Sequence, residues 1–490
     1  MYVKLDLPAG IARVATEYAA SGRYYDADLV RWWQGVIQPM GGWRNISTTT
    51  VSGVARSIVT WIDNSNQIWA GIGTDTGLHV MTQTGVVSDV TPAGFTAGRE
   101  DASFGGGYGS GAYGAASYGT ARSNISVVNR ASMWTLDVFG QFLIGCMPED
   151  GNIYRWELAT GTPAAVIANA PTNCTSVLSS ESLFVLALGA GGDPRRIDWS
   201  DRGDENTWTP SVINLAGTVQ LQSNGKIICG KRFRGGDLIF TTTDVHLARY
   251  VGRPEVFIFE RLANGCGIVS AQAAAVVGNR AFWMTDSGFW EYNGFAQPLP
   301  CDVQDFVFEN LSESQRSKVH AVHNSGYGEV WWFYPSKDSE EPDRYVIYNY
   351  LEGYWNIGEL ARTCGTNQDA FAKPLYVDID GQVYEHEIGK MRDAREPYVR
   401  SAPIEMGNGE QFIYAREYVP DEQTVGESEI LFHTRMYPNG PESTYGPVQS
   451  ASPAHVRFSG RQVAYEYRFN DGEDARVGSG RVKIAMGGSR

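Results

Sequence analysis

The sequence has few cysteines and no segment suited to crossing a membrane. Its 490 residues include only 6 cysteines, which are widely separated and form no C-x-x-C pair. Scattered cysteines beside apolar residues are typical of buried thiols in a reducing compartment and give no zinc ligand set. No run of about 18 apolar residues occurs, and residues 1–6 do not resemble a signal peptide. We therefore expect a soluble protein that is assembled in a cytoplasm, with no membrane segment, metal or cofactor.

Positive charge is also scarce. The chain carries 55 acidic residues against 40 Lys and Arg, a formal net charge of −15. This balance makes the whole protein a poor candidate for tight binding to phosphate backbones. Two local basic clusters remain, residues 226–234 and the set Arg457, Arg461 and Arg468. They indicate either salt bridges to acidic neighbours or an interface to an acidic partner or to DNA.

Glycine and aromatic residues, in contrast, are abundant. There are 56 glycines, and 12% of the residues are aromatic, a composition produced by many short strands joined by glycine turns. Residues 279–292 show the pattern most clearly. An apolar strand around Trp283 runs into the turn Asp286-Ser287-Gly288, and a second strand follows from Phe289. One such hairpin cannot bury its apolar face alone, so it needs neighbouring copies.

Similar hairpins recur along the chain at the spacing of propeller blades. Turns lie near positions 76, 151, 192, 243, 287, 340 and 380. Successive turns are about 40–53 residues apart, close to the roughly 40–50 residues of a blade, except for a first gap of about 75. When such units are arranged in a ring, each unit covers the apolar face that its neighbour would otherwise expose. We predict an all-β protein with a propeller of six to seven blades.

The predicted propeller spans residues 46–400, with a different pattern on either side. Residues 401–490 show longer alternating strands and are predicted to form a separate antiparallel β-sandwich-like platform domain. Residues 1–45 are dense in aromatic side chains, which need a partner surface. We expect this N-terminal arm to pack on the propeller or on a neighbouring subunit. The candidate interface residues are Tyr25, Asp26, Arg31, Trp32, Trp33, Arg457 and Arg461.

A glycine- and tyrosine-rich insertion at residues 101–125 explains the long first gap. Its glycine content excludes a stable helix or packed strand by itself. Tyr108, Tyr113 and Tyr118 recur every fifth residue. Two interpretations stay open, a flexible linker or a loop that orders against a partner. In the second case the three tyrosines are candidates for an interface or a channel loop.

No motif of a common catalytic site is present. The chain lacks a G-x-S-x-G elbow, a phosphate-binding loop and a dinucleotide fingerprint after a strand. His320 and His323 have H-x-x-H spacing but no zincin-type glutamate, which favours packing over metal binding. Ser200 to Trp208 is similar to sialidase-type turns but with the wrong spacing, so its aspartates are predicted to form turns. We predict that the chain is not an enzyme; a glycan-binding or glycan-hydrolysing propeller is the alternative.

Several short stretches, at both ends and in the middle of the chain, share one resemblance. They are residues 17–18 (Glu-Tyr), 24–31 (Tyr-Tyr-Asp-Ala-Asp-Leu-Val-Arg), 41–43 (Gly-Gly-Trp), the Gly/Tyr tract at 105–119, residues 193–208 and residues 456–461 (Val-Arg-Phe-Ser-Gly-Arg). These stretches resemble phage tail structural proteins, and in architecture the chain resembles the nozzle proteins of short-tailed phages, also called tail tubular protein B or packaged-DNA stabilisation proteins.

The resemblance implies a β-propeller with a β-rich platform, found in the virion tail as a homo-oligomeric ring, usually a hexamer. Such a ring sits below the portal and adaptor proteins, retains packaged DNA and later conducts it during ejection. It also supports tail fibres, a spike or a needle. Double-stranded DNA is then a transient partner, and the acidic charge of this chain suits a channel wall that does not hold phosphates.

Overall fold

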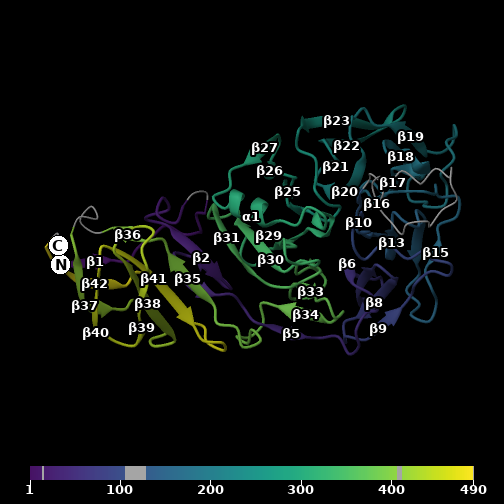
Figure 1. Ribbon diagram of the computed structural model, residues 1–490. Helices are drawn as coiled ribbons and strands as arrows, with labels where there is room; N and C mark the ends of the chain where they lie inside the picture. The colour runs from purple at the N-terminus through teal and green to yellow at the C-terminus, as the bar shows by residue number, and fades with distance from the viewer. Residues whose placement is uncertain (14–15, 105–127, 406–410, 489–490) are drawn as a thin grey trace, which may run out of the picture.

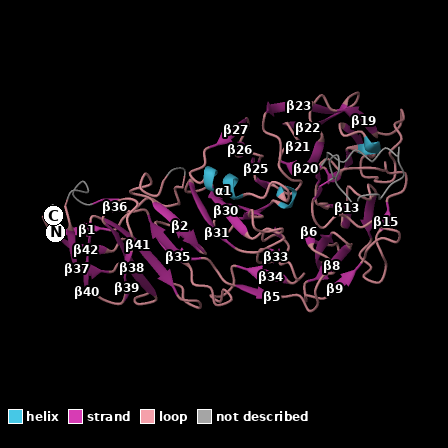
Figure 2. Cartoon of the chain, viewed as in Figure 1, coloured by secondary structure: helices cyan, strands magenta, loops and turns pink. Residues whose placement is uncertain are grey.

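Strands make up nearly all of the regular secondary structure of the protein, and loops join them (Figure 2). The computed structural model describes residues 1–13, 16–104, 128–405 and 411–488. Within these ranges it has 42 strands, one α-helix, α1 (Gln304–Asn310), and two 3-10 turns, η1 (Ala190–Gly192) and η2 (Arg316–Lys318). None of the described helices is long and apolar enough to span a membrane. Two β domains lie end to end, and both chain termini are at the far end of the smaller one (Figure 1).

The larger domain is a β-propeller of seven blades, which confirms the predicted fold class at its upper blade count. Each blade is a four-stranded antiparallel sheet. The first four blades are β6 (Ala55–Ile62), β7 (Ile68–Thr74), β8 (Leu78–Thr82) and β9 (Val87–Asp89); β12 (Thr135–Phe139), β13 (Phe142–Cys146), β14 (Ile153–Trp156) and β15 (Ala165–Val166); β16 (Ser176–Ser179), β17 (Val185–Leu188), β18 (Arg196–Trp199) and β19 (Gly217–Gln220); and β20 (Ile227–Phe233), β21 (Gly236–Thr241), β22 (Asp244–Gly252) and β23 (Val256–Asn264).

The last blade differs from the others in where its outer strand comes from. Blades five to seven are β24 (Ala274–Val277), β25 (Arg280–Met284), β26 (Phe289–Tyr292) and β27 (Ala296–Leu299); β28 (His320–Asn324), β29 (Glu329–Tyr334), β30 (Arg344–Asn349) and β31 (Tyr354–Glu359); and β32 (Cys364–Thr366), β33 (Leu375–Val377), β34 (Val383–His386) and β5 (Trp43–Asn45).

An N-terminal strand closes the ring of blades. Strand β5 pairs with β34, placing Trp43 opposite His386. The innermost strands contact one another in sequence order, and β32 of blade seven contacts β6 of blade one. The propeller is therefore a closed ring whose final blade combines the beginning and the end of the domain.

Aromatic packing between blades explains the sequence of residues 279–292. Strand β25 is covered on both faces, so its residues from 281 to 284 are all 0% exposed instead of alternating. The ring of Trp283 lies 5.5 Å from that of Phe240 in blade four, and the ring of Phe289 lies 4.9 Å from that of Trp332 in blade six. Residues 279–292 therefore form the interior of blade five, which packs between blades four and six.

The smaller domain is a sandwich of two antiparallel sheets. Apolar side chains meet between the sheets, where Phe432 and Phe458 stack at 4.6 Å. The outer sheet, in spatial order, is β1 (Tyr2–Lys4), β42 (Arg481–Met486), β37 (Ile413–Val419) and β40 (Ala454–Gly460). The inner sheet is β2 (Tyr24–Asp28), β35 (Tyr398–Ser401), β41 (Gln462–Phe469), β38 (Ser428–Arg435) and β39 (Ser443–Gln449), with β36 (Ile404–Glu405) also paired to β41.

The expected domain boundaries need a correction at the N-terminus. Residues 1–45 do not form a separate arm. Strands β1 and β2 belong to the sandwich, β5 belongs to the propeller, and the hairpin of β3 (Val30–Trp33) and β4 (Val36–Pro39) lies between them in the chain. The aromatic density of this segment reflects strands whose partners lie hundreds of residues away, a pairing that local sequence does not reveal.

The Gly/Tyr insertion leaves the propeller between blades one and two. Its two flanks pair as β10 (Ser103–Phe104) and β11 (Val128–Asn129), which brings both ends of the insertion together. Tyr108, Tyr113 and Tyr118 lie outside the described residues, so the choice between linker and ordered loop stays a prediction.

Candidate functional site

The hairpin β3–β4 carries Arg31 into a buried site that we call the joint, formed with Glu329 and Glu387. Arg31 is 1% exposed, and its Nε donates to Glu329 Oε1 at 3.0 Å. A terminal guanidinium nitrogen donates to Glu387 Oε2 at 2.9 Å. Glu329 begins β29 in blade six, and Glu387 directly follows β34 in blade seven. One arginine therefore binds carboxylates from two blades.

The electrostatics of the joint depend on that shared guanidinium. Burial raises the pKa of Glu329 above its ordinary value, with Arg31 opposing the shift. Burial acts in the same direction on Glu387. The charge and hydrogen bonds of Arg31, together with hydrogen bonds from Gly41 and Asn324, outweigh it and hold the pKa of this carboxyl below its usual value. The guanidinium also lies 3.7 Å from the ring centre of Tyr327. Removing Arg31 would leave two buried carboxylates without their cation.

Trp32 adds apolar contact to the joint from the next position. Its ring lies 5.2 Å from Tyr24 in β2 of the sandwich and 5.5 Å from Tyr354 in β31 of the propeller. The side chain is 3% exposed. Trp32 thus packs between the two domains.

Of the two expected partner surfaces, the propeller or a neighbouring subunit, Arg31 and Trp32 meet the first, because both are buried against the propeller of the same chain. Trp32 also contacts the sandwich through Tyr24. Trp33 is half-buried, with its ring edge-on to Tyr327 at 5.3 Å. The sequence shows that such residues need a covering surface, but it does not show whether the surface comes from the same chain.

Tyr25 and Asp26, on β2, are half-buried and also have partners in the chain. The guanidinium of Arg13 lies 4.8 Å from the ring centre of Tyr25 and 3.2 Å from Asp26 Oδ1. The hydroxyl of Tyr398 donates to the other carboxylate oxygen of Asp26 at 3.2 Å. Burial raises the pKa of Asp26, with Arg13 opposing it. Their predicted role in an interface between subunits stays a prediction.

Polar side chains from several blades meet at the axis of the propeller. Lys231 Nζ in β20 donates to Gln272 Oε1 at 2.9 Å. The amide nitrogen of Gln272 donates to Ser57 Oγ in β6 at 3.1 Å and to the carbonyl of Trp134 at 2.7 Å. Burial lowers the pKa of Lys231. These bonds link blades one and four to the segments before blades two and five.

A second group at the axis involves the next residue of β20. Arg232 forms an ion pair with Asp137 of blade two and donates to the carbonyl of Val138 at 2.7 Å. Burial raises the pKa of Asp137, and Arg232 opposes the shift. The basic cluster predicted at residues 226–234 is therefore divided: Lys231 and Arg232 bind groups inside the ring, while Lys226 and Arg234 are exposed.

A small cavity of about 160 Å³ lies where several innermost strands begin. Arg99 and Arg130, which flank the insertion, contribute to its lining together with Glu149. Arg99 forms an ion pair with Glu149, and its Nε donates to the carbonyl of Arg130 at 3.0 Å. The residues on either side of the Gly/Tyr insertion therefore lie beside this end of the propeller axis.

The sequence motifs that suggested chemistry have structural roles. His320 lies in strand β28, where its ring stacks on Phe333 at 5.0 Å. No group of His, Cys, Asp and Glu in the described ranges is placed to hold a metal ion. In the sialidase-like stretch, Asp201 Oδ1 accepts the backbone N–H of Leu215 at 2.8 Å, and Asp204 Oδ1 accepts that of Asn206 at 3.0 Å. Both aspartates stabilise turns.

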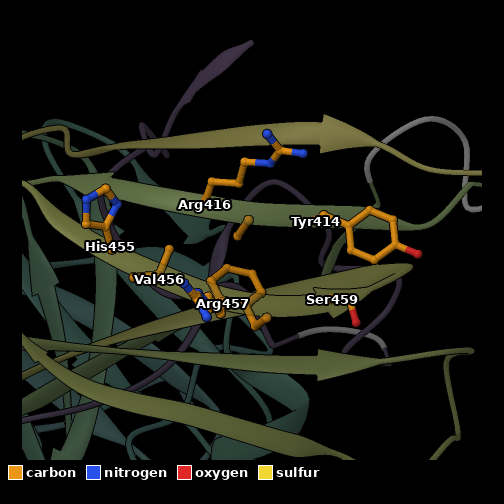
Figure 3. Close-up of a pocket in the computed structure, with 8 residues that line it drawn as sticks. Tyr414, Arg416, His455, Val456, Arg457 and Ser459 are labelled. Carbon is orange, nitrogen blue, oxygen red and sulfur yellow. The ribbon is translucent and has the colours of Figure 1, made fainter.

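Arg457 lies on the solvent side of the outer sheet of the sandwich, in a surface that we call the outer basic face. Figure 3 shows this region around β37 and β40, with Tyr414, Arg416, His455 and Arg457 drawn as sticks. They line an open groove of about 700 Å³. The outer basic face consists of Lys4, Arg416, His455, Arg457, Arg481 and Lys483, all exposed.

Strand geometry brings these six residues to one side of the sheet. Cross-strand partners share a face, and Lys4 lies opposite Arg481 in the pairing of β1 with β42. Arg416 occupies a bulge, where the register of β37 shifts between Ala415 and Glu417. Arg461 is not part of the face; it is half-buried in the turn before β41, with its guanidinium 5.1 Å from the ring centre of Phe412.

Glu329, Glu387 and most of the outer basic face do not stand out as functional residues in the sequence. The alternation Arg481-Val482-Lys483-Ile484 is a signal for the face, because period-two charge marks the exposed side of a strand. Nothing local marks Arg416, since a bulge changes the side to which a residue points. Glu329 and Glu387 are two among 55 acidic residues, and only the fold brings them to Arg31.

Comparison with known proteins assigns no family to this chain. No family model and no curated protein matches the sequence. The WD40 domain of Pan2 from Neurospora crassa is 9% identical, with a TM-score of 0.42 over 71% of this chain and 97% of that one. Virginiamycin B lyase from Staphylococcus aureus is 8% identical, with a TM-score of 0.39 over 70% and 97%. The N-terminal domain of Nup159 is 9% identical, with a TM-score of 0.38 over 71% and 96%.

Proposed function

We propose that this chain is a structural subunit of a phage tail that assembles into a ring-shaped nozzle, which retains packaged DNA and conducts it during ejection. The proposal starts from the sequence resemblance to tail nozzle proteins. The observation that carries it is the position of the resembling N-terminal residues: 24–31 supply β2 and Arg31 of the joint, and 41–43 lead into β5, which closes the propeller. These residues supply a strand of the sandwich, the arginine of the joint and the strand that completes the last blade.

The charge distribution supports the same role. A subunit with a net charge of −15 repels phosphates, so DNA can move past it without being bound. The exposed cations of the outer basic face, at the end of the molecule distant from the propeller, offer a surface for assembly instead (Figure 1). A negative net charge and a separate basic contact surface suit a subunit of a ring that surrounds DNA.

The assembly state of the purified protein tests the proposal. Native mass spectrometry and negative-stain electron microscopy should show closed rings of a fixed number of copies, with six expected from the resemblance. Added portal–adaptor complex should bind these rings. A protein that stays monomeric at high concentration and binds oligosaccharides would contradict the proposal and support a glycan-binding propeller.

A further inference from the structure

The outer basic face has more cations than the chain itself neutralises. Lys4 pairs with Asp6 at 2.6 Å, and Lys483 lies 3.4 Å from Glu417. Arg416, Arg457 and Arg481 form no ion pair with any described residue. One sheet face therefore carries three exposed arginines that have no ionic partner in the described part of a chain whose net charge is −15.

Aromatic side chains lie among these cations. Tyr2 is 50% exposed and Tyr414 is 47% exposed, and both stand on the same side of the sheet as the arginines. Figure 3 shows Tyr414 and Arg416 rising from β37 beside the groove. Arginine and tyrosine are both enriched in protein–protein interfaces relative to the rest of the surface. This composition fits a protein partner.

The same chain carries a matching negative surface, which we call the acidic ridge: Asp305, Glu309 and Glu313. Asp305 and Glu309 are exposed about one turn apart on α1, and Glu313 is exposed three residues after the helix ends at Asn310. Phe306 and Phe308 are half-buried and hold α1 in place; Phe308 lies 5.5 Å from Phe289 of blade five. No acid of the ridge forms an ion pair within the described ranges.

The two surfaces lie far apart in one molecule and cannot neutralise each other there. The strands of the outer basic face stand at the end of the sandwich, whereas α1 lies beside the propeller (Figure 1). Resting on the proposed function, we propose that the outer basic face of one copy binds the acidic ridge of the next copy. Contact between two different surfaces is heterologous, so it generates a ring when the rotation closes.

Charge reversal tests the contact. The triple variant Arg416→Glu, Arg457→Glu, Arg481→Glu should raise the dissociation constant for self-association at least about tenfold, measured by mass photometry and sedimentation velocity. The variant Asp305→Lys, Glu309→Lys, Glu313→Lys should do the same. Mixing the two variants should restore assembly, because each reversed surface then meets a complementary one. This restoration also shows that both variants are folded.

A matched control changes the charge equally at another place. Lys226→Glu, Arg234→Glu, Lys337→Glu reverses three exposed cations of the propeller and should assemble like the wild type. Higher salt should weaken wild-type assembly through screening.

Three outcomes would overturn the inference. If the wild type forms rings and both charge-reversed variants form them equally well, this contact is wrong while the proposed function stands. If the wild type never self-associates, both proposals fail. If the arginine variant loses binding of a duplex DNA fragment but keeps normal assembly, the face binds nucleic acid and the partner assignment is wrong.

Discussion

Arg31 in the joint and Arg457 on the outer basic face differ in nearly everything around them. Arg31 is 1% exposed and binds two carboxylates from different blades, while Arg457 is exposed and has no ionic partner in the described chain. A buried arginine of this kind is required for the fold, because its loss leaves two buried carboxylates without a cation and away from water. An exposed arginine without a partner contributes little to stability and is available for binding. Substitutions in the interior should therefore lower the free energy of unfolding, whereas substitutions on the outer basic face should leave it nearly unchanged and affect binding.

The largest expected effect lies inside the propeller. Trp283→Ala should lower the free energy of unfolding by about 3–5 kcal/mol, since the side chain is 0% exposed and its indole N–H donates to the carbonyl of Cys266 at 2.8 Å. Denaturant unfolding measures the change. Phe295→Ala in the same blade, at a side chain 62% exposed, is the control and should be nearly neutral. A loss below about 1 kcal/mol for Trp283→Ala would mean that the blade interior is loosely packed.

The joint comes next. Arg31→Met should cost about 3 kcal/mol, because Glu329 and Glu387 stay buried without their cation. The same unfolding measurement applies. Arg44→Met is the matched control: its side chain is 64% exposed and pairs with Glu385 at 2.8 Å, so the cost should stay within about 1 kcal/mol. Equal costs for the two variants would remove the distinction between buried and exposed arginines.

A buried histidine gives the interior a pH dependence. Burial lowers the pKa of His320 to about 3 from an ordinary 6.5. Below about pH 6.5 His320 is protonated in the unfolded chain but stays neutral in the folded chain. The free energy of unfolding therefore falls as the pH falls. Between pH 7 and pH 5 this group should cost about 2 kcal/mol. Free energies of unfolding at the two pH values, for wild type and His320→Gln, should show a smaller drop in the variant. Equal drops would contradict the assignment.

The smallest effects are expected on the outer basic face. Single alanine substitutions at Arg416, Arg457 and Arg481 should each change the free energy of unfolding by no more than about 0.5 kcal/mol. Unfolding should be measured at a protein concentration too low for self-association. A loss above about 1 kcal/mol at any one of them would show that the face has a role in the fold, and the contrast with the joint would fail.

The sequence predicts the propeller because its signals are local. A blade hairpin such as residues 281–292 contains two strands and the turn between them, and turn residues repeat at blade spacing. Strands β1, β2 and β5 escape prediction because their partners lie hundreds of residues away. Short aromatic strands at the N-terminus carry no information about which distant edge they complete.

The candidate sites show the same division. Arg457 stands out in the sequence through its basic neighbours, and the structure places it exposed on β40, while its role in an interface stays a prediction. The sequence shows that the segment with Arg31 needs a covering surface, but not that the carboxylates contacting Arg31 come from blades six and seven. The acidic ridge needs the structure as well, because the burial of Val307, with Phe306 and Phe308 half-buried beside it, decides which side of α1 faces solvent.

The strand that closes the propeller has a consequence for biosynthesis. Strand β5 leaves the ribosome early but must wait for β34, which is made about 340 residues later, or roughly 17–70 s at 5–20 residues per second. Strand β1 waits longer still, for β42. The outer basic face needs Lys4 from one end of the chain and Arg481 from the other. A chain interrupted during translation therefore lacks the surface proposed for self-association, which would keep incomplete subunits out of the ring.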